Sequence, residues 1–340
     1  MIQSIKRKSV LFNIFAVLLL IFLTACGSKT VGDSAGQDDK DQLKAAFITA
    51  QKVGDNGPVD MAYSGLKKGT EEFGIKGQLI EVEKGEYEES MRAMAQDGYK
   101  LIIALFPELL DAVKRVAPEF PETKFVMILG QVDEPNVRSI FQNEQEGAFL
   151  SGVLAASMTT TNKIGFIGGN DNPQINRWLA GYQAGAKEVN PNVEVVNSYV
   201  GDFENPTKGK ELALTQYKNG VDIIFHAAAK SGLGVLDAAK DTGNYAIGGS
   251  ADQNDTVPGQ VLGSAVEFYN NMVYDALKDL KEGNPIGGEM EFGGLKEERI
   301  DLVLAPDNLV DIPDDLKEKI NDYRQKIING EIEVPDKPIR

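Results

Sequence analysis

Cysteine and histidine are almost absent from this chain of 340 residues, which has one of each, Cys26 and His226. A lone cysteine cannot form a disulfide within the chain, so the fold must depend on its hydrophobic core alone. A lone histidine without a cysteine partner in the folded part does not match the usual zinc-ligand spacings. We therefore expect no metal and no cofactor, and we interpret His226 as a satisfied imidazole near the core.

Positive charge is also scarce, because 35 lysines and arginines face 51 aspartates and glutamates, which gives a formal net charge of -16. Such an excess of negative charge argues against binding of nucleic acid or of an anionic membrane surface by the folded part. Residues 165–169 do not form a Gly-x-Gly-x-x-Gly motif, and neither a Walker lysine nor a Gly-x-Ser-x-Gly elbow is present. The sequence thus predicts a protein that is not an enzyme.

Only one long apolar run occurs, at residues 10–23, and Lys6, Arg7 and Lys8 precede it. It is shorter than the ~20 residues of a membrane-spanning helix and has the charge and length of a signal peptide. The run ends in Leu23-Thr24-Ala25-Cys26, which resembles the bacterial lipobox. The resemblance implies lipidation of Cys26 and anchoring on the extracytoplasmic face of the cell membrane. An ordinary secreted protein with one spare thiol is the alternative.

The mature chain is expected to begin with a polar, flexible tether, residues 26–42, after a signal peptide of residues 1–25. Beyond it, short apolar runs alternate with amphipathic segments, as expected of parallel strands joined by helical crossovers. The expected strands are residues 44–49, 78–82, 101–105, 124–128, 137–141, 163–167, 193–199, 222–226, 245–248 and 261–266. The expected helices are residues 60–73, 87–96, 109–117, 144–158, 175–189, 206–218, 232–241 and 313–328.

The alternation restarts after residue 158, which predicts an α/β protein of two lobes. We expect lobe 1 to comprise residues 43–142 and 262–330, lobe 2 residues 143–261, and a surface tail residues 331–340. Residues 291–304 alternate polar and apolar side chains, which favours an antiparallel pair.

Several motifs occur in a specific order along residues 43–304. They are KIGFIGGNDNP at 163–173, GYQAGAK at 181–187, EQEGAFL at 144–150, PTKGKELA at 206–213 and AAAKSGLG at 227–234. This set resembles the basic membrane protein family, the purine nucleoside receptor A-like lipoproteins. The resemblance implies a type I periplasmic-binding-protein fold, in which two doubly wound parallel-sheet lobes are joined by a three-stranded hinge and bind a solute between them.

Ligands of open parallel sheets bind beyond the carboxyl ends of the strands, so we expect the site in the loops that follow them. The resemblance matches Asp55 to an aspartate of the family's first loop, and we include its neighbour Asn56, although residues 55–58 are also typical of a plain turn. Phe106 follows a strand and is able to cover one face of a flat ligand, although packing in the core is the equal alternative. Asp171 and Asn176, at the start of a helix, are expected to face the cleft, whereas Trp178 is expected in the core.

Three positions depart from the family's nucleoside binders. Leu129 and Ser250 each replace an aspartate, and Glu267 replaces a lysine, while Asp252 stays in place. The predicted ligand-binding residues are therefore Asp55, Asn56, Phe106, Asp171, Asn176, Ser250, Asp252 and Glu267. A nucleobase, a modified nucleoside or an unrelated polar or cationic solute remains open, since Glu267 is able to pair with a positive group.

Three classes of function remain. The first is a solute-binding lipoprotein that delivers a nucleoside-like or nucleobase-like compound to an ABC import permease and its ATPase. The second is a lipoprotein sensor that uses the same lobe closure to signal, without transport. The third is a hydrolase that acts in the cleft. The sequence favours the first of these classes, the solute-binding lipoprotein.

Overall fold

The computed structural model describes residues 42–54 and 57–339. The expected signal peptide, most of the tether including Cys26, and the predicted site residues Asp55 and Asn56 lie outside the described residues.

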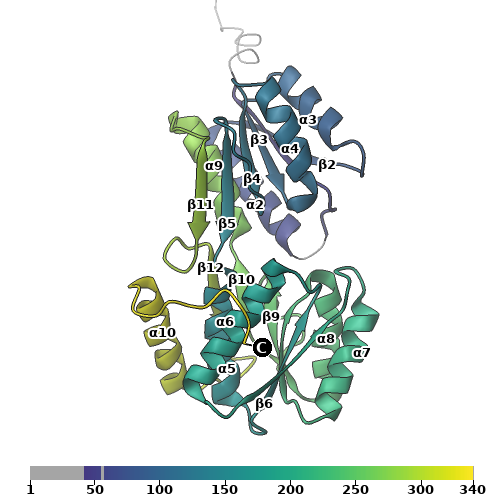
Figure 1. The fold of residues 1–340 in the computed structure, drawn as a ribbon, viewed down its shortest axis with the longest axis vertical. Coiled ribbons are helices and arrows are strands. Elements are labelled where there is room, and N and C mark those ends of the chain that lie inside the picture. The colour runs from purple at the N-terminus through teal and green to yellow at the C-terminus, as the bar shows by residue number, and fades with distance from the viewer. Residues whose placement is uncertain (1–41, 55–56, 340) are drawn as a thin grey trace, which may run out of the picture. The chain divides into compact units, whose positions relative to one another are not determined.

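The first lobe is built on a sheet whose strands are parallel throughout (Figure 1). Its order is β11 (Glu289–Gly293), β5 (Val137–Gln142), β4 (Lys124–Ile128), β3 (Leu101–Leu105), β1 (Lys44–Thr49) and β2 (Lys76–Glu81). Helices α2 (Pro58–Phe73) and α9 (Tyr269–Glu282) pack into one hydrophobic cluster, and α3 (Tyr87–Gln96) and α4 (Leu110–Val116) pack into another. Short 3-10 turns at Pro107–Leu109 and Ala117–Glu119 flank α4.

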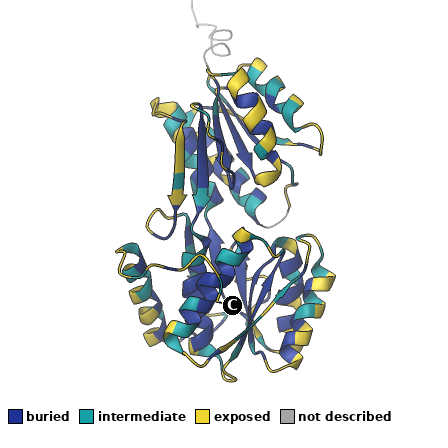
Figure 2. Ribbon diagram, viewed as in Figure 1, coloured by how far each residue is buried: buried dark blue, intermediate teal, exposed yellow. Residues whose placement is uncertain are grey.

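The second lobe repeats this architecture with a sheet of the order β12 (Ile300–Leu304), β10 (Val261–Glu267), β9 (Tyr245–Ser250), β8 (Ile223–Ala227), β6 (Lys163–Gly168) and β7 (Glu194–Tyr199). Only β12 runs antiparallel to its neighbour. Helices α5 (Glu144–Met158), α6 (Pro173–Val189) and α10 (Asp314–Ile328) share one hydrophobic cluster. Helices α7 (Pro206–Lys218) and α8 (Ala229–Thr242) share the other, and the central strands of both sheets are buried (Figure 2).

Helices α5 and α6 approach so closely that glycine is required between them. A Cβ atom added at Gly181 would lie 2.0 Å from the backbone oxygen of Gln145, and one at Gly185 would lie 2.0 Å from that of Phe149. Any side chain at these positions would push the helices apart. This contact fixes the place of α6, which carries residues of the site described below.

Three chain segments connect the lobes within the described residues. They follow β5, β10 and β11, at about residues 143, 268 and 294–299. Hydrogen bonds tie the segments to one another: Asn143 N donates to Gly293 O at 2.8 Å, and Phe268 N donates to Arg299 O at 2.9 Å. The expectation of two doubly wound lobes joined by a three-stranded hinge is confirmed.

Two details differ from the sequence-based expectations. Residues 289–304 do not form an antiparallel pair, because β11 pairs with β5 in the first sheet and β12 pairs with β10 in the second. In addition, only some of residues 262–330 belong to lobe 1. Strands β10 and β12 and helix α10 belong to the second lobe, and only the segment from α9 to β11 belongs to the first.

Both differences have one physical cause. A short amphipathic strand can add to any open sheet edge, and each lobe offers one. Alternation along the chain reveals a strand but not the sheet that it joins.

The tail after α10 lies against the second lobe. Val334 is 9% exposed within the α5–α6–α10 cluster, and Ile339 N donates to Oε1 of Gln183 on α6 at 2.8 Å. Among the described residues, none of the helices combines the length and the apolar character needed to span a membrane.

Candidate functional site

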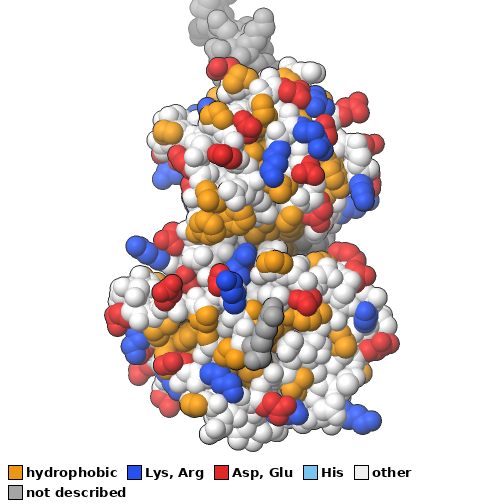
Figure 3. Space-filling model, viewed as in Figure 1, with side chains coloured by type: hydrophobic (Ala, Val, Ile, Leu, Met, Phe, Trp, Pro, Cys, Tyr) orange, Lys and Arg blue, Asp and Glu red, His pale blue; other side chains and the backbone are white. Residues whose placement is uncertain are grey.

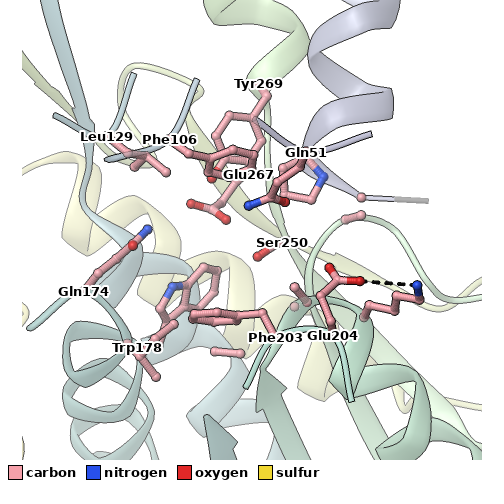
Figure 4. Close-up of a pocket in the computed structure, with 18 of the residues that line it drawn as sticks. Gln51, Phe106, Leu129, Gln174, Trp178, Phe203, Glu204, Ser250, Glu267 and Tyr269 are labelled. Atoms are coloured by element: carbon pink, nitrogen blue, oxygen red, sulfur yellow. Dashed lines mark hydrogen bonds and ion pairs between the residues drawn. The ribbon is translucent and has the colours of Figure 1, made fainter. Parts of the chain in front are cut away.

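A cavity of about 430 Å³ lies where the carboxyl ends of strands from both sheets meet (Figure 4). The first lobe and the start of α9 contribute Gln51, Pro58, Phe106, Leu129 and Tyr269 to its wall. The second lobe contributes Gln174, Trp178, Phe203, Lys230, Ser250 and Glu267. In the space-filling view, hydrophobic side chains gather along the edge of the first lobe that faces this region (Figure 3). The site therefore draws on both lobes, as the sequence predicted from strand ends.

Four cavity residues have left-handed backbone conformations. They are Phe106 (φ 83°) after β3, Leu129 (φ 66°) after β4, Ala229 (φ 46°) at the start of α8 and Ser250 (φ 69°) at the end of β9. This conformation disfavours every residue except glycine by ~1–2 kcal/mol. Such strain clusters at binding sites because the surrounding sheet holds each side chain in a functional position.

Glu267 occupies the centre of the cavity. It ends β10, at the point where the chain leaves the second sheet, and it is 2% exposed. Its carboxylate points into the space between Phe106 and Tyr269 on one side and Trp178 on the other (Figure 4). Burial, together with the nearby charge of Glu144, raises the pKa of Glu267 to about 8, while the hydroxyls of Ser250 and Tyr269 act in the opposite direction. The side chain is therefore mostly protonated at neutral pH.

A buried ion pair lies behind Glu267. Nε and Nη2 of Arg177 on α6 donate to the two carboxylate oxygens of Glu144 on α5, at 2.7 and 3.0 Å. Glu144 is fully buried, and this burial raises its pKa although Arg177 opposes the shift. Arg177 directs these two hydrogen bonds to Glu144, and among the described residues no cation forms an ion pair with Glu267, although the charge of Arg177 lowers its pKa.

The loop after β9 is held by the buried hydroxyl of Ser264, which accepts from Gln253 N and donates to Oδ1 of Asn254, both at 3.0 Å. The side-chain oxygen of Gln253 in turn lies 2.8 Å from Nε2 of His226. Burial lowers the pKa of His226 to about 4. A neutral, buried imidazole agrees with its predicted place near the core. The imidazole is not fully satisfied, however, because its Nδ1 has no hydrogen-bond partner among the described residues.

The structure brings Phe106, Ser250 and Glu267 together in the cavity wall, with Leu129 beside them. Asp171, Asn176 and Asp252 were expected to face the cleft, but among the described residues they do not line this cavity.

The three have other contacts. Asn176 donates to Asp171 and accepts from the hydroxyl of Tyr199, and the Asp252 carboxylate accepts from Asn254 N. Their polar atoms stabilise the start of α6 and a tight turn, which are local roles that the sequence could not distinguish from ligand contacts.

Other cavity residues were not among the predicted set. Trp178, expected in the core, is 1% exposed yet lines the cavity. Gln174 and Tyr269 lie at the starts of α6 and α9, and Phe203 lies in the loop between β7 and α7. A usable signal existed for Gln174 and Trp178, because both lie in the first turns of the helix that follows β6.

The model of the family described as ABC transporter substrate-binding protein PnrA-like matches residues 42–338. The chain belongs to this family. A CD4+ T-cell-stimulating antigen of Listeria monocytogenes is 34% identical over 91% of this chain and 87% of that protein. The ABC transporter nucleoside-binding protein BmpA of Lactococcus lactis is 31% identical over 98% of this chain and all of its own length.

Solved structures agree with this assignment to the PnrA-like family. An ABC transporter solute-binding protein from Aeropyrum pernix has 26% sequence identity and a TM-score of 0.74, over 86% of this chain and 94% of its own. This PnrA-like chain is thus a substrate-binding protein of the ABC transporter type, a family of binding proteins rather than of enzymes. Within the part of the chain that the structure describes, no group of three or more histidine, cysteine, aspartate or glutamate residues is arranged to hold a metal ion.

Proposed function

We propose that the chain is an extracytoplasmic lipoprotein that binds a small polar solute of the nucleoside or nucleobase type. It would deliver this solute to an ABC import permease and its ATPase. The observation that carries the proposal is the cavity shared by the two lobes, whose volume of about 430 Å³ suits a small molecule. The name of the Lactococcus lactis relative, a nucleoside-binding protein, supports the choice of solute class.

The geometry suggests how binding is passed on to a permease. Phe106 and Leu129 belong to the first lobe, whereas Trp178 and Ser250 belong to the second. A solute that contacts both sets binds more tightly when the lobes are close together than when they are apart. This difference in affinity stabilises the closed arrangement. The three connecting segments supply the hinge for this change.

Attachment to the membrane is proposed from the lipobox-like residues before Cys26, which lie outside the described residues. Two or three acyl chains on one residue would anchor the protein firmly. Replacement of Cys26 by alanine is expected to move the protein from the membrane fraction to the soluble fraction. Retention of the Cys26→Ala variant in the membrane fraction would contradict the proposed anchor.

The function is tested by denaturing the protein purified from its native host and identifying released small molecules by mass spectrometry. A released nucleoside or nucleobase that raises the melting temperature when added back would support the proposal. If no compound of this class is released or bound at millimolar concentration, the proposal is wrong. Chromatography of the recovered solute distinguishes binding from hydrolysis, because binding leaves the solute chemically unchanged.

A further inference from the structure

The cavity presents a buried carboxyl group with unused bonding capacity. Oε1 of Glu267 is inaccessible to solvent and has no hydrogen-bond partner among the described residues. The side chain is 2% exposed and points into the cavity (Figure 4). A buried polar atom without a partner calls for an explanation. Glu267 also lines the cavity, where a bound solute is able to supply the partner.

The cations nearest to this carboxyl group are already paired. Arg177 holds Glu144 at 2.7 Å, and Lys230, which lines the cavity, lies 3.2 Å from the carboxylate of Glu204. Glu108 adds a further negative charge to the cavity wall. Carboxyl groups thus outnumber amines in the lining. Glu267 adds a negative charge to this lining when it loses its proton, and that charge attracts a positive solute.

Aromatic rings complete the environment of Glu267. Phe106 and Tyr269 lie on one side of the carboxyl group, and Trp178 and Phe203 lie on the other (Figure 4). The faces of such rings attract cations, most strongly where water is excluded. Aromatic side chains on two sides also suit a flat ring system.

We propose that the solute is a flat, nitrogen-rich ring compound that carries a positive charge, and that its charged edge pairs with Glu267. This inference rests on the proposed function and specifies its solute.

Binding of such a cation should be coupled to the release of one proton. The groups that face the Glu267 carboxyl are Glu144 on α5, Arg177 on α6, Tyr269 on α9 and Ser250 on β9. Burial raises the pKa of Glu267 to about 8, so the empty site holds a proton at neutral pH. A cation replaces that proton, and the net charge of the buried site stays constant. A neutral solute would leave the proton in place.

The test compares each of two neutral nucleosides with its cationic N-methyl derivative. The pairs are adenosine with 1-methyladenosine and cytidine with 3-methylcytidine. Isothermal titration at pH 7, in two buffers that differ in ionisation enthalpy, gives the affinity and the number of protons released. We expect the cation of at least one pair to bind at least tenfold more tightly than its parent and to release close to one proton.

Two variants complete the design. Glu267→Gln keeps the shape of the protonated side chain but cannot become an anion, so it should reduce the preference for the cation at least tenfold. Glu211→Gln removes the same charge from the exposed surface of α7 and should retain that preference. Proton release by the unmodified protein does not depend on the folding of either variant.

The outcomes separate the inference from the function on which it rests. If a neutral nucleoside binds as tightly as its methylated partner, without proton release, the inference is overturned and the proposed function stands. The same conclusion follows if Glu267→Gln folds and keeps the preference for the cation. If none of the four compounds binds, the inference is overturned, and the proposed function is decided separately by the solute that the purified protein releases.

Discussion

Replacing Glu267 with glutamine should change how the stability of the empty protein depends on pH. The pKa of Glu267 is raised from 4.5 to about 8, first by burial and then by the charge of Glu144. The folded state therefore binds more protons than the unfolded state between these two pH values. The stabilisation that the protonated side chain provides is complete below pH 4.5 and is lost as the pH rises towards 8.

The magnitude follows from this shift. One pKa unit corresponds to ~1.4 kcal/mol, so the unmodified protein should lose ~3 kcal/mol of stability through Glu267 between pH 5 and pH 8. Glutamine does not titrate, and the variant lacks this contribution. Glu144 titrates in both proteins and largely cancels in the comparison.

The assay is urea denaturation of solute-free protein at pH 5, 6, 7 and 8, with Glu211→Gln as the control for a surface charge. We expect Glu267→Gln to become progressively more stable than the unmodified protein as the pH rises, whereas Glu211→Gln follows the unmodified protein. Parallel stability curves for Glu267→Gln and the unmodified protein would refute the reasoning, because they would mean that Glu267 is already ionised at pH 5 in the folded state.

Three further predictions concern the surroundings of the cavity. Arg177→Met leaves the buried carboxylate of Glu144 unpaired and should lower the free energy of unfolding by ~3–5 kcal/mol; a loss below 1 kcal/mol in chemical denaturation would contradict this. Gly181→Val places a side chain against the backbone of Gln145, and the overpacking should cost ~1–3 kcal/mol, seen as a lower melting temperature; an unchanged melting temperature would show that α5 and α6 separate freely. Trp178 is the only tryptophan and lines the cavity, so a bound solute should shift or quench the tryptophan fluorescence. If calorimetry shows that the protein is saturated with solute while the emission spectrum is unchanged, the solute binds elsewhere.

Much of the fold was predictable from the sequence because buried parallel strands leave a clear pattern. The apolar runs at residues 44–49, 101–105 and 124–128 coincide with observed strands, and α5 and α7 have the expected bounds. Strand β11 and helix α9 were harder to place. The partners of β11 lie about 150 residues earlier in the chain, and α9 follows a change of lobe that local periodicity does not record.

The site was predictable where a residue directly follows a strand. Phe106 was named for that reason, whereas Ser250 and Glu267 were named from the family resemblance, and all three line the cavity. Phe203 and Tyr269 were missed, since their positions depend on how a loop or helix packs after the chain has left a sheet.

The left-handed backbone at Phe106, Leu129, Ala229 and Ser250 affects how this protein would respond to directed evolution. These angles are part of the fold, so the folded state carries a penalty of ~1–2 kcal/mol at each position. Selection for heat resistance alone should then accept glycine at Ala229 or Ser250, because glycine removes the penalty there. Selection for tight capture should keep the side chains at Phe106 and Ser250, and the two regimes should yield different sequences on the same scaffold.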